Sequence, residues 1–353
     1  MTDYLKLTAY FGERQRSGSQ FVAEAMLDLF TERCVDTSIM LRGITGFGTH
    51  HVLRTDESLS LSEDPPLAVV ALDTDAVISN LAGDIAALMQ HGLITVERTR
   101  LVDQPAAIAS DTGSARLTVA LGRNRRIRRT PAFAAVCDLF YQHRFAGATA
   151  LLGVDGTADG QRRRARFFSR NRDVPLAIIA VGSTDQARAA LPDLQNTLVR
   201  PLVVTERIRV CKRDGVLLDR PPALPATDSR GRPLWQKLMI HSSESARHDG
   251  QPVHRAIVGR LRQQRAAMGA TVLRGVWGFQ GDRSPRGDRF IQWGRQVPVT
   301  TIVIDTPENI ARSFDLIDDI TAQHGLVTCE TVPALLALVG GERRGGLEPA
   351  VYP

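Results

Sequence analysis

Two glycine-rich stretches, each opened by an arginine, are the residues of this sequence best suited to contact a small anionic ligand. One reads Arg42-Gly43-Ile44-Thr45-Gly46-Phe47-Gly48, and the other reads Arg274-Gly275-Val276-Trp277-Gly278-Phe279-Gln280-Gly281. Because glycine has no Cβ atom, its backbone N–H group can approach a phosphate or a base closely. The candidate ligand-binding residues are therefore Gly43, Gly46, Phe47, Gly48, Gly275, Gly278, Phe279 and Gly281.

The arginines that open these stretches have two interpretations of equal weight. Arg42 and Arg274 could bind a phosphate group through their guanidinium forks. Alternatively, each forms a structural ion pair with a glutamate from a matching loop, either Glu13 or Glu244. We therefore keep Glu13 and Glu244 among the candidate site residues.

Arginine is concentrated in two segments in the middle of the chain. Residues 123–129 contain five arginines and residues 161–172 contain six. Arginine recognises phosphate well, so these segments could bind nucleic acid, an anionic surface or an acidic partner. We favour the alternative that these segments are solvated loops without a partner. Among the possible partners nucleic acid is the less favoured, because few aromatic residues lie between the arginines. The candidate basic patch is Arg125, Arg126, Arg128, Arg129, Arg162, Arg163, Arg164 and Arg166.

Catalytic and metal-binding patterns do not appear in the sequence. It has no nucleophile elbow, no HExxH and no P-loop, and its four cysteines stand far apart. The 353 residues carry a net charge of +6, which permits an anionic partner without requiring one. Without a signal-peptide pattern or a long apolar run, we expect a cytoplasmic protein that is not an enzyme and holds no metal.

Three segments of the chain align with one another at nearly constant spacing. Gly43 matches Gly153 after 110 residues and Gly275 after 232 residues, and the register holds over most of each segment. A period of this length indicates three copies of a small domain rather than a solenoid. We expect repeats at 1–102, 116–212 and 234–339, linkers at 103–115 and 213–233, and a flexible tail at 340–353, the middle repeat being the divergent one.

Hydrophobic periodicity in the first repeat predicts the order β-α-β-β-α-β. The pattern predicts a strand at 5–11, a helix over 21–33, a strand at 37–41 and a long loop over 43–63. It then predicts an apolar strand at 66–72, a helix over 75–90 and a strand at 93–101. This order is typical of the ferredoxin-like α+β fold. In that fold the loops after the first and second strands and the turn before the last strand meet at one sheet edge, where we expect the site.

These motifs resemble the PII-like family catalogued as domain of unknown function 190. The resemblance rests on Lys6-Leu7-Thr8, on Leu41 to Gly48, on Gly92-Leu93-Ile94-Thr95 and on Gly269 to Phe279, and it covers nearly all of the chain outside the linkers and tail. The middle repeat has Leu152 and Thr157 where the others have arginine and phenylalanine. The resemblance implies three ferredoxin-like units that form an intramolecular pseudo-trimer, monomeric as a chain.

PII-like proteins typically bind adenine nucleotides in the clefts between subunits and regulate a membrane transporter or an enzyme. The resemblance therefore implies a non-enzymatic signalling protein that binds an adenine nucleotide between its repeats. The turn before the last strand, Gln90-His91-Gly92 in the first repeat, lacks the Gly- and Lys-rich character of triphosphate binders in that family. An AMP-like effector is therefore a better expectation than ATP, with a basic interaction scaffold as the alternative function.

Overall fold

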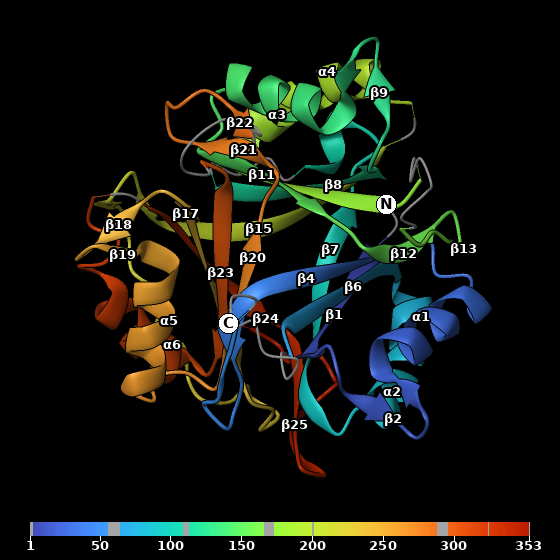
Figure 1. The fold of residues 1–353 in the computed structure, drawn as a ribbon, viewed down its shortest axis with the longest axis vertical. Coiled ribbons are helices and arrows are strands. Elements are labelled where there is room, and N and C mark those ends of the chain that lie inside the picture. The colour runs from blue at the N-terminus through green and yellow to red at the C-terminus, as the bar shows by residue number, and fades with distance from the viewer. Residues whose placement is uncertain are drawn as a thin grey trace.

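The computed structural model describes residues 3–55, 64–108, 113–165, 173–199, 201–287, 296–323 and 325–352. Each of the three repeats contains two helices and a four-stranded sheet, with short hairpins between the main strands (Figure 1). Repeat 1 comprises β1 (Asp3–Gly12), β2 (Arg16–Ser17), β3 (Gln20–Phe21), α1 (Val22–Glu32), β4 (Thr37–Phe47), β5 (Leu53–Thr55), β6 (Pro66–Thr74), α2 (Asp75–Leu88) and β7 (His91–Leu101).

The other two repeats follow the same order. After a 3-10 turn η1 (Pro105–Ala107), repeat 2 comprises β8 (Ser114–Gly122), β9 (Arg126–Ile127), β10 (Thr130–Pro131), α3 (Ala132–Gln142), β11 (Gly147–Leu152), β12 (Asp155–Ala158), β13 (Gln161–Arg162), β14 (Pro175–Ser183), α4 (Thr184–Thr197) and β15 (Leu202–Arg213). After β16 (Val216–Leu217), repeat 3 comprises β17 (Trp235–Ser243), β18 (Arg247–His248), β19 (Gln251–Pro252), α5 (Val253–Gln263), β20 (Ala270–Arg274), β21 (Trp277–Gln280), β22 (Arg286–Gly287), β23 (Pro298–Asp305), α6 (Pro307–Ile317) and β24 (Leu326–Val332). Among the described residues no helix is both long and apolar enough to cross a membrane.

Local sequence explains where the helices lie. The apolar side chains of α1 recur at helical spacing, so Val22, Met26 and Phe30 are buried on one face. Helix α4 begins at a capping box, in which the Ser183 hydroxyl accepts a hydrogen bond from the Gln186 backbone N–H. The Thr306 hydroxyl caps α6 in the same way.

Within each repeat the four main strands form one antiparallel sheet. The order is β4-β6-β1-β7 in repeat 1, β11-β14-β8-β15 in repeat 2 and β20-β23-β17-β24 in repeat 3. The second strand of repeat 1 extends to Phe47, well beyond the predicted end at residue 41, and its additional length pairs with another repeat.

Strand pairing between repeats closes two rings of three. In the first ring the end of β4 pairs with β20, β21 pairs with β11, and β12 pairs with the start of β4. In the second ring the end of β7 pairs with β15, the end of β15 pairs with β24, and β25 (Ala334–Val339) pairs with β7. Each repeat therefore pairs strand edges with both of the others, which covers edges that would otherwise be open to another chain.

The sheets are covered on both faces. Three helix pairs, α1 with α2, α3 with α4, and α5 with α6, lie at three corners of the molecule around the central strands (Figure 1). Each pair closes its own apolar core against one face of its sheet. A fourth apolar core lies on the sheet faces that point away from the helices and joins all three repeats. It includes Leu41, Leu151 and Leu273 from the second strands. Because both faces of the sheets are buried, their strands read as continuous apolar runs in the sequence.

The C-terminal segment is ordered where we expected a flexible tail. Residues Glu342–Gly346 form β26, which pairs with β25. The Tyr352 hydroxyl then donates to the backbone carbonyl of Trp235 or Val332, at 2.6 and 2.7 Å, and accepts from the Trp235 N–H. The tail therefore adds a strand and an anchor to repeat 3.

Candidate ligand-binding clefts

The glycines of the recurring motif lie where a strand of one repeat pairs with a strand of the next. A Cβ atom on Gly46 would lie 2.4 Å from the carbonyl oxygen of Ala270, and one on Gly278 would lie 2.1 Å from that of Ala148. Gly156 of repeat 2 has the same relation to Ser38, at 2.0 Å. The recurrence that suggested a ligand loop thus has a structural cause, since only glycine permits this approach of the neighbouring backbone.

A cavity of about 300 Å³ opens beside the first of these seams, between repeats 1 and 3. We call it the first cleft, and it is lined by Gly46, Phe47 and Gly48 at the end of β4 and by residues 269–271 at the start of β20. Tyr10, Ile302 and Ala337 contribute apolar wall. A largely apolar cavity of this size with a few polar groups is typical of a small-molecule site.

Polar groups of the first cleft come from positions outside the glycine-rich motif. The Gln15 side-chain nitrogen is buried and has no hydrogen-bond partner among the described residues. His50 and His91 both line the cleft, with ring centroids 5.9 Å apart, and Arg54 forms an ion pair of 3.2 Å with Asp64. His91 begins β7, where its Nδ1 accepts a hydrogen bond from the Gly340 N–H at 3.1 Å.

A second cleft, of about 310 Å³, lies beside the corresponding strands of repeat 3, and Asp214 from the segment that follows repeat 2 completes its lining. It includes Gly278 and Phe279 of the other predicted motif, together with several serines and glutamines. Gly281 lies between two lining residues in a left-handed turn with φ of 59°, where its N–H donates to the Ala146 carbonyl.

The remaining residues of the predicted ligand set lie outside the linings of these clefts. Arg42 pairs with Glu13 at 2.8 Å on the surface, and Arg274 pairs with Glu244 at 2.8 Å. Both pairs are the ion pairs that the sequence offered as an alternative to phosphate binding. Gly43 and Gly275 pack against Pro66 and Pro298, and a Cβ atom on either would lie within 3.1 Å of its proline.

Part of the predicted basic patch binds another repeat. Arg162 forms ion pairs with Asp155 at 2.8 Å and with Asp28 and Glu24 on α1 of repeat 1, at 2.5 and 3.1 Å. Arg164 pairs with Glu24 at 3.1 Å. These contacts hold the described part of this loop of repeat 2 against repeat 1 and neutralise the charges of Arg162 and Arg164.

The other arginines of that patch have local roles or stand at the surface. Arg125 donates a hydrogen bond to the Val199 carbonyl and Arg126 donates one to the Arg129 carbonyl, both at 2.9 Å. Arg163 donates a hydrogen bond to the side-chain oxygen of Gln161. Arg128 and Arg129 are exposed, and Arg166 lies outside the described residues.

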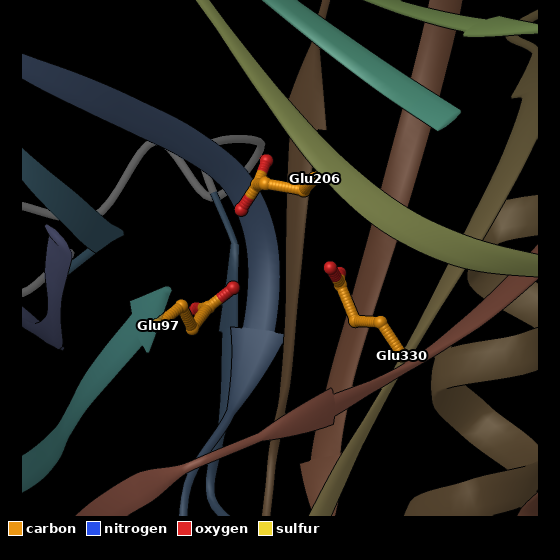
Figure 2. Close-up of side chains that lie close together, drawn as sticks. All are labelled: Glu97, Glu206 and Glu330. Atoms are coloured by element: carbon orange, nitrogen blue, oxygen red, sulfur yellow. The ribbon is translucent and has the colours of Figure 1, made fainter. Parts of the chain in front are cut away.

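A ring of six buried charges lies where the three repeats meet. Lys6, Arg116 and Lys237 occupy the same place on the first strand of each repeat, and Glu97, Glu206 and Glu330 occupy the same place on the last. The three carboxylates point towards one another from β7, β15 and β24 (Figure 2). All six side chains are nearly inaccessible to solvent.

Each cation of this charge ring bridges its own repeat to the next. Lys6 pairs with Glu97 at 3.0 Å and also with Glu206. Arg116 pairs with Glu206 at 2.9 Å and with Glu330 at 2.5 Å. Lys237 pairs with Glu330 at 3.0 Å and also with Glu97. Three cations thus neutralise three carboxylates, so the cluster has the chemistry of an ion-pair ring rather than of a metal site.

The charge ring makes the protein sensitive to acid. Burial raises the pKa of Glu97, but the nearby ammonium groups of Lys237 and Lys6 outweigh it and lower the pKa to about 2. The pKa of Glu206 is lowered in the same way, its burial being outweighed by Arg116 and Lys6. Since an unfolded glutamate titrates near 4.5, the stability that these carboxylates contribute is full above that pH and is lost as the pH falls towards 2.

We therefore expect the urea midpoint of the protein to fall steeply between about pH 4.5 and 2. Glu97→Gln should start from a lower midpoint near neutral pH and show a shallower fall, because one of the titrating carboxylates is absent. Urea titrations followed by circular dichroism at several pH values measure both slopes. Equal slopes for the two proteins would contradict this assignment.

Comparisons with known proteins agree with the repeat organisation. The model of the family DUF190, described as "Uncharacterized ACR", matches residues 4–101, 114–210 and 235–334. A "UPF0166 protein" of Aquifex aeolicus (strain VF5) is 30% identical over 99 residues, which are 28% of this chain and 90% of that protein. A crystal structure of an unknown protein from Galdieria sulphuraria aligns over 63% of this chain and 98% of its own at 11% identity, and its TM-score of 0.16 is too low to relate the folds.

Proposed function

This chain belongs to the uncharacterised DUF190 family, of which it holds three copies, and we propose from this premise that it is a non-enzymatic regulatory protein that binds AMP or a similar adenine nucleotide. The proposal assigns the nucleotide to the first cleft. The observation that carries it is a cavity between two repeats that combines an aromatic wall with the Gln15 Nε2 amide nitrogen, which has no partner among the described residues. A buried donor without a partner is costly, and a ring nitrogen of a bound base would satisfy it.

The proposal includes an intramolecular pseudo-trimer of ferredoxin-like units. The strand order within each repeat and the two closed rings of strand pairing between repeats support it. PII-like proteins, which the sequence motifs resemble, bind nucleotides between such units, and we propose the same position here by analogy. By the same analogy, the regulated partner is a membrane transporter or an enzyme.

The size and charge of the first cleft favour a monophosphate. About 300 Å³ is at the small end of ligand cavities, and Arg54, His50 and His91 supply only a few groups for an anion. In isothermal titration we expect AMP or cyclic AMP to bind more tightly than ADP and ATP, and Gln15→Ala to weaken AMP binding about tenfold through loss of one hydrogen bond. Failure of all four nucleotides to bind would overturn the proposal.

A basic scaffold remains the second function that the sequence offers, and the structure gives it less support. Arg162 and Arg164 are engaged with acidic residues of repeat 1, so they contribute little free charge to a surface. The nucleotide proposal is preferred because a cavity carries it.

A further inference from the structure

Two buried polar atoms without hydrogen-bond partners among the described residues lie near the second cleft, one in its lining and one in a recess behind it. Ser242 is 2% exposed, and within the described chain its Oγ makes no hydrogen bond. His241 is 6% exposed, and its Nε2 is likewise unbonded to any described group. Both residues line a recess of about 10 Å³ that shares Ser242, Phe279, Gln280 and Pro298 with the main cavity.

The protonation state of His241 is defined by its surroundings. Burial, with a smaller contribution from Arg116, lowers the pKa of His241 to about 3. The imidazole is therefore neutral near pH 7. Its Nδ1 lies 3.1 Å from the Thr300 hydroxyl, which leaves Nε2 for one further hydrogen bond.

The same two positions carry aromatic side chains in the first cleft. The repeat alignment matches His241 to Tyr10 and Ser242 to Phe11, both of which line the first cleft. The first cleft therefore has aromatic side chains at both positions, whereas the second cleft has the Ser242 hydroxyl, and His241 lines only the recess behind it. The two clefts are therefore not chemically equivalent.

The rest of the second cleft continues this polar character without a net charge. Ser243 and Ser245 share a hydrogen bond of 2.8 Å, and Gln280 donates to the His241 carbonyl at 3.0 Å. Two acidic side chains, Asp214 and Asp282, balance two basic ones, Arg283 and Arg286, all of them exposed. A lining of hydroxyls and amides with balanced charge matches a ligand that is itself rich in hydroxyl groups and uncharged.

We propose that the second cleft binds a neutral, hydroxyl-rich small molecule of sugar or cyclitol size, held at its inner end by Ser242 Oγ. This site is separate from the nucleotide site proposed for the first cleft and has a ligand of another chemical class. It stands whether or not AMP binds.

The test uses D-ribose and myo-inositol as probes on the full chain. Sugars stabilise many proteins without binding, so saturation-transfer NMR with a saturable titration is a better readout than thermal stability. We expect at least one probe to bind wild type at millimolar concentration. Ser242→Ala should weaken that binding by about tenfold or more, because the variant removes a hydrogen-bonding hydroxyl.

A matched control separates ligand contact from packing. Thr301 is 1% exposed and also has a buried hydroxyl without a partner in the described structure, yet it lines none of these cavities. Thr301→Val should therefore bind the probe as wild type does, and both variants should unfold at a urea midpoint close to wild type. The proposal is overturned if neither probe gives a saturable signal, or if Ser242→Ala binds as tightly as Thr301→Val.

Discussion

Replacement of Arg116 by methionine is expected to lower the free energy of unfolding by about 3–5 kcal/mol. Arg116 is fully buried and holds Glu206 and Glu330, one from its own repeat and one from the next. Methionine fills a similar space but leaves both carboxylates without their main partner in a site closed to water. The cost comes mainly from these uncompensated charges and not from the lost contact itself.

Arg42→Met is the matched control for this prediction. Arg42 also pairs with a glutamate at 2.8 Å, but its side chain is 51% exposed, and an exposed pair contributes about 0–1 kcal/mol. Urea unfolding of both variants beside wild type measures the difference. A loss below about 1 kcal/mol for Arg116→Met would show that the charge ring does not hold the repeats together.

The charge ring also explains why the three repeats meet in one register. Each cation contacts the glutamate of its own repeat and that of a neighbour, so a shift of any repeat along its seam separates opposite charges. Apolar contacts alone tolerate such shifts more readily, since they are not directional. Buried polar groups can thereby specify an arrangement at some cost in stability.

Much of the fold was predictable because its signals are local. Apolar spacing located α1 and α2, and the constant offset of about 110 residues between repeats 1 and 2 revealed the copies. The extension of β4 to Phe47 was missed because its partner, β20, comes more than two hundred residues later. The order in the tail was missed because the hairpin of β25 and β26 is held by distant partners, since β25 pairs with β7 and Tyr352 bonds the Trp235 carbonyl.

The site was predicted less completely than the fold. The glycine motif located the clefts, but Gly46 and Gly278 are explained by strand pairing, and the polar groups of the first cleft come from Gln15, His50 and His91. The charge ring left a signal that was not followed. Lys6, Arg116 and Lys237 align, as do Glu97, Glu206 and Glu330, so a cation recurs at one position of each first strand and a glutamate at one position of each last strand.

The location of the proposed nucleotide site can be tested at Gly48. A Cβ atom on Gly48 would meet nothing within 4 Å, unlike one on Gly46, so a substitution there leaves the seam between repeats 1 and 3 intact. Because Gly48 lines the first cleft, a tryptophan at this position would occupy a large share of its about 300 Å³. We expect Gly48→Trp to weaken AMP binding about a hundredfold or more, which corresponds to about 3 kcal/mol.

The most direct measurement is an AMP titration of wild type, Gly48→Trp and Gly83→Trp by isothermal calorimetry. Gly83 lies on α2 with no atom within 4 Å of its Cβ position and does not line the cleft, so it controls for the added indole. The account predicts that wild type and Gly83→Trp bind AMP equally and that Gly48→Trp does not bind. Equal binding by all three proteins, or binding by none, would contradict a nucleotide site in the first cleft.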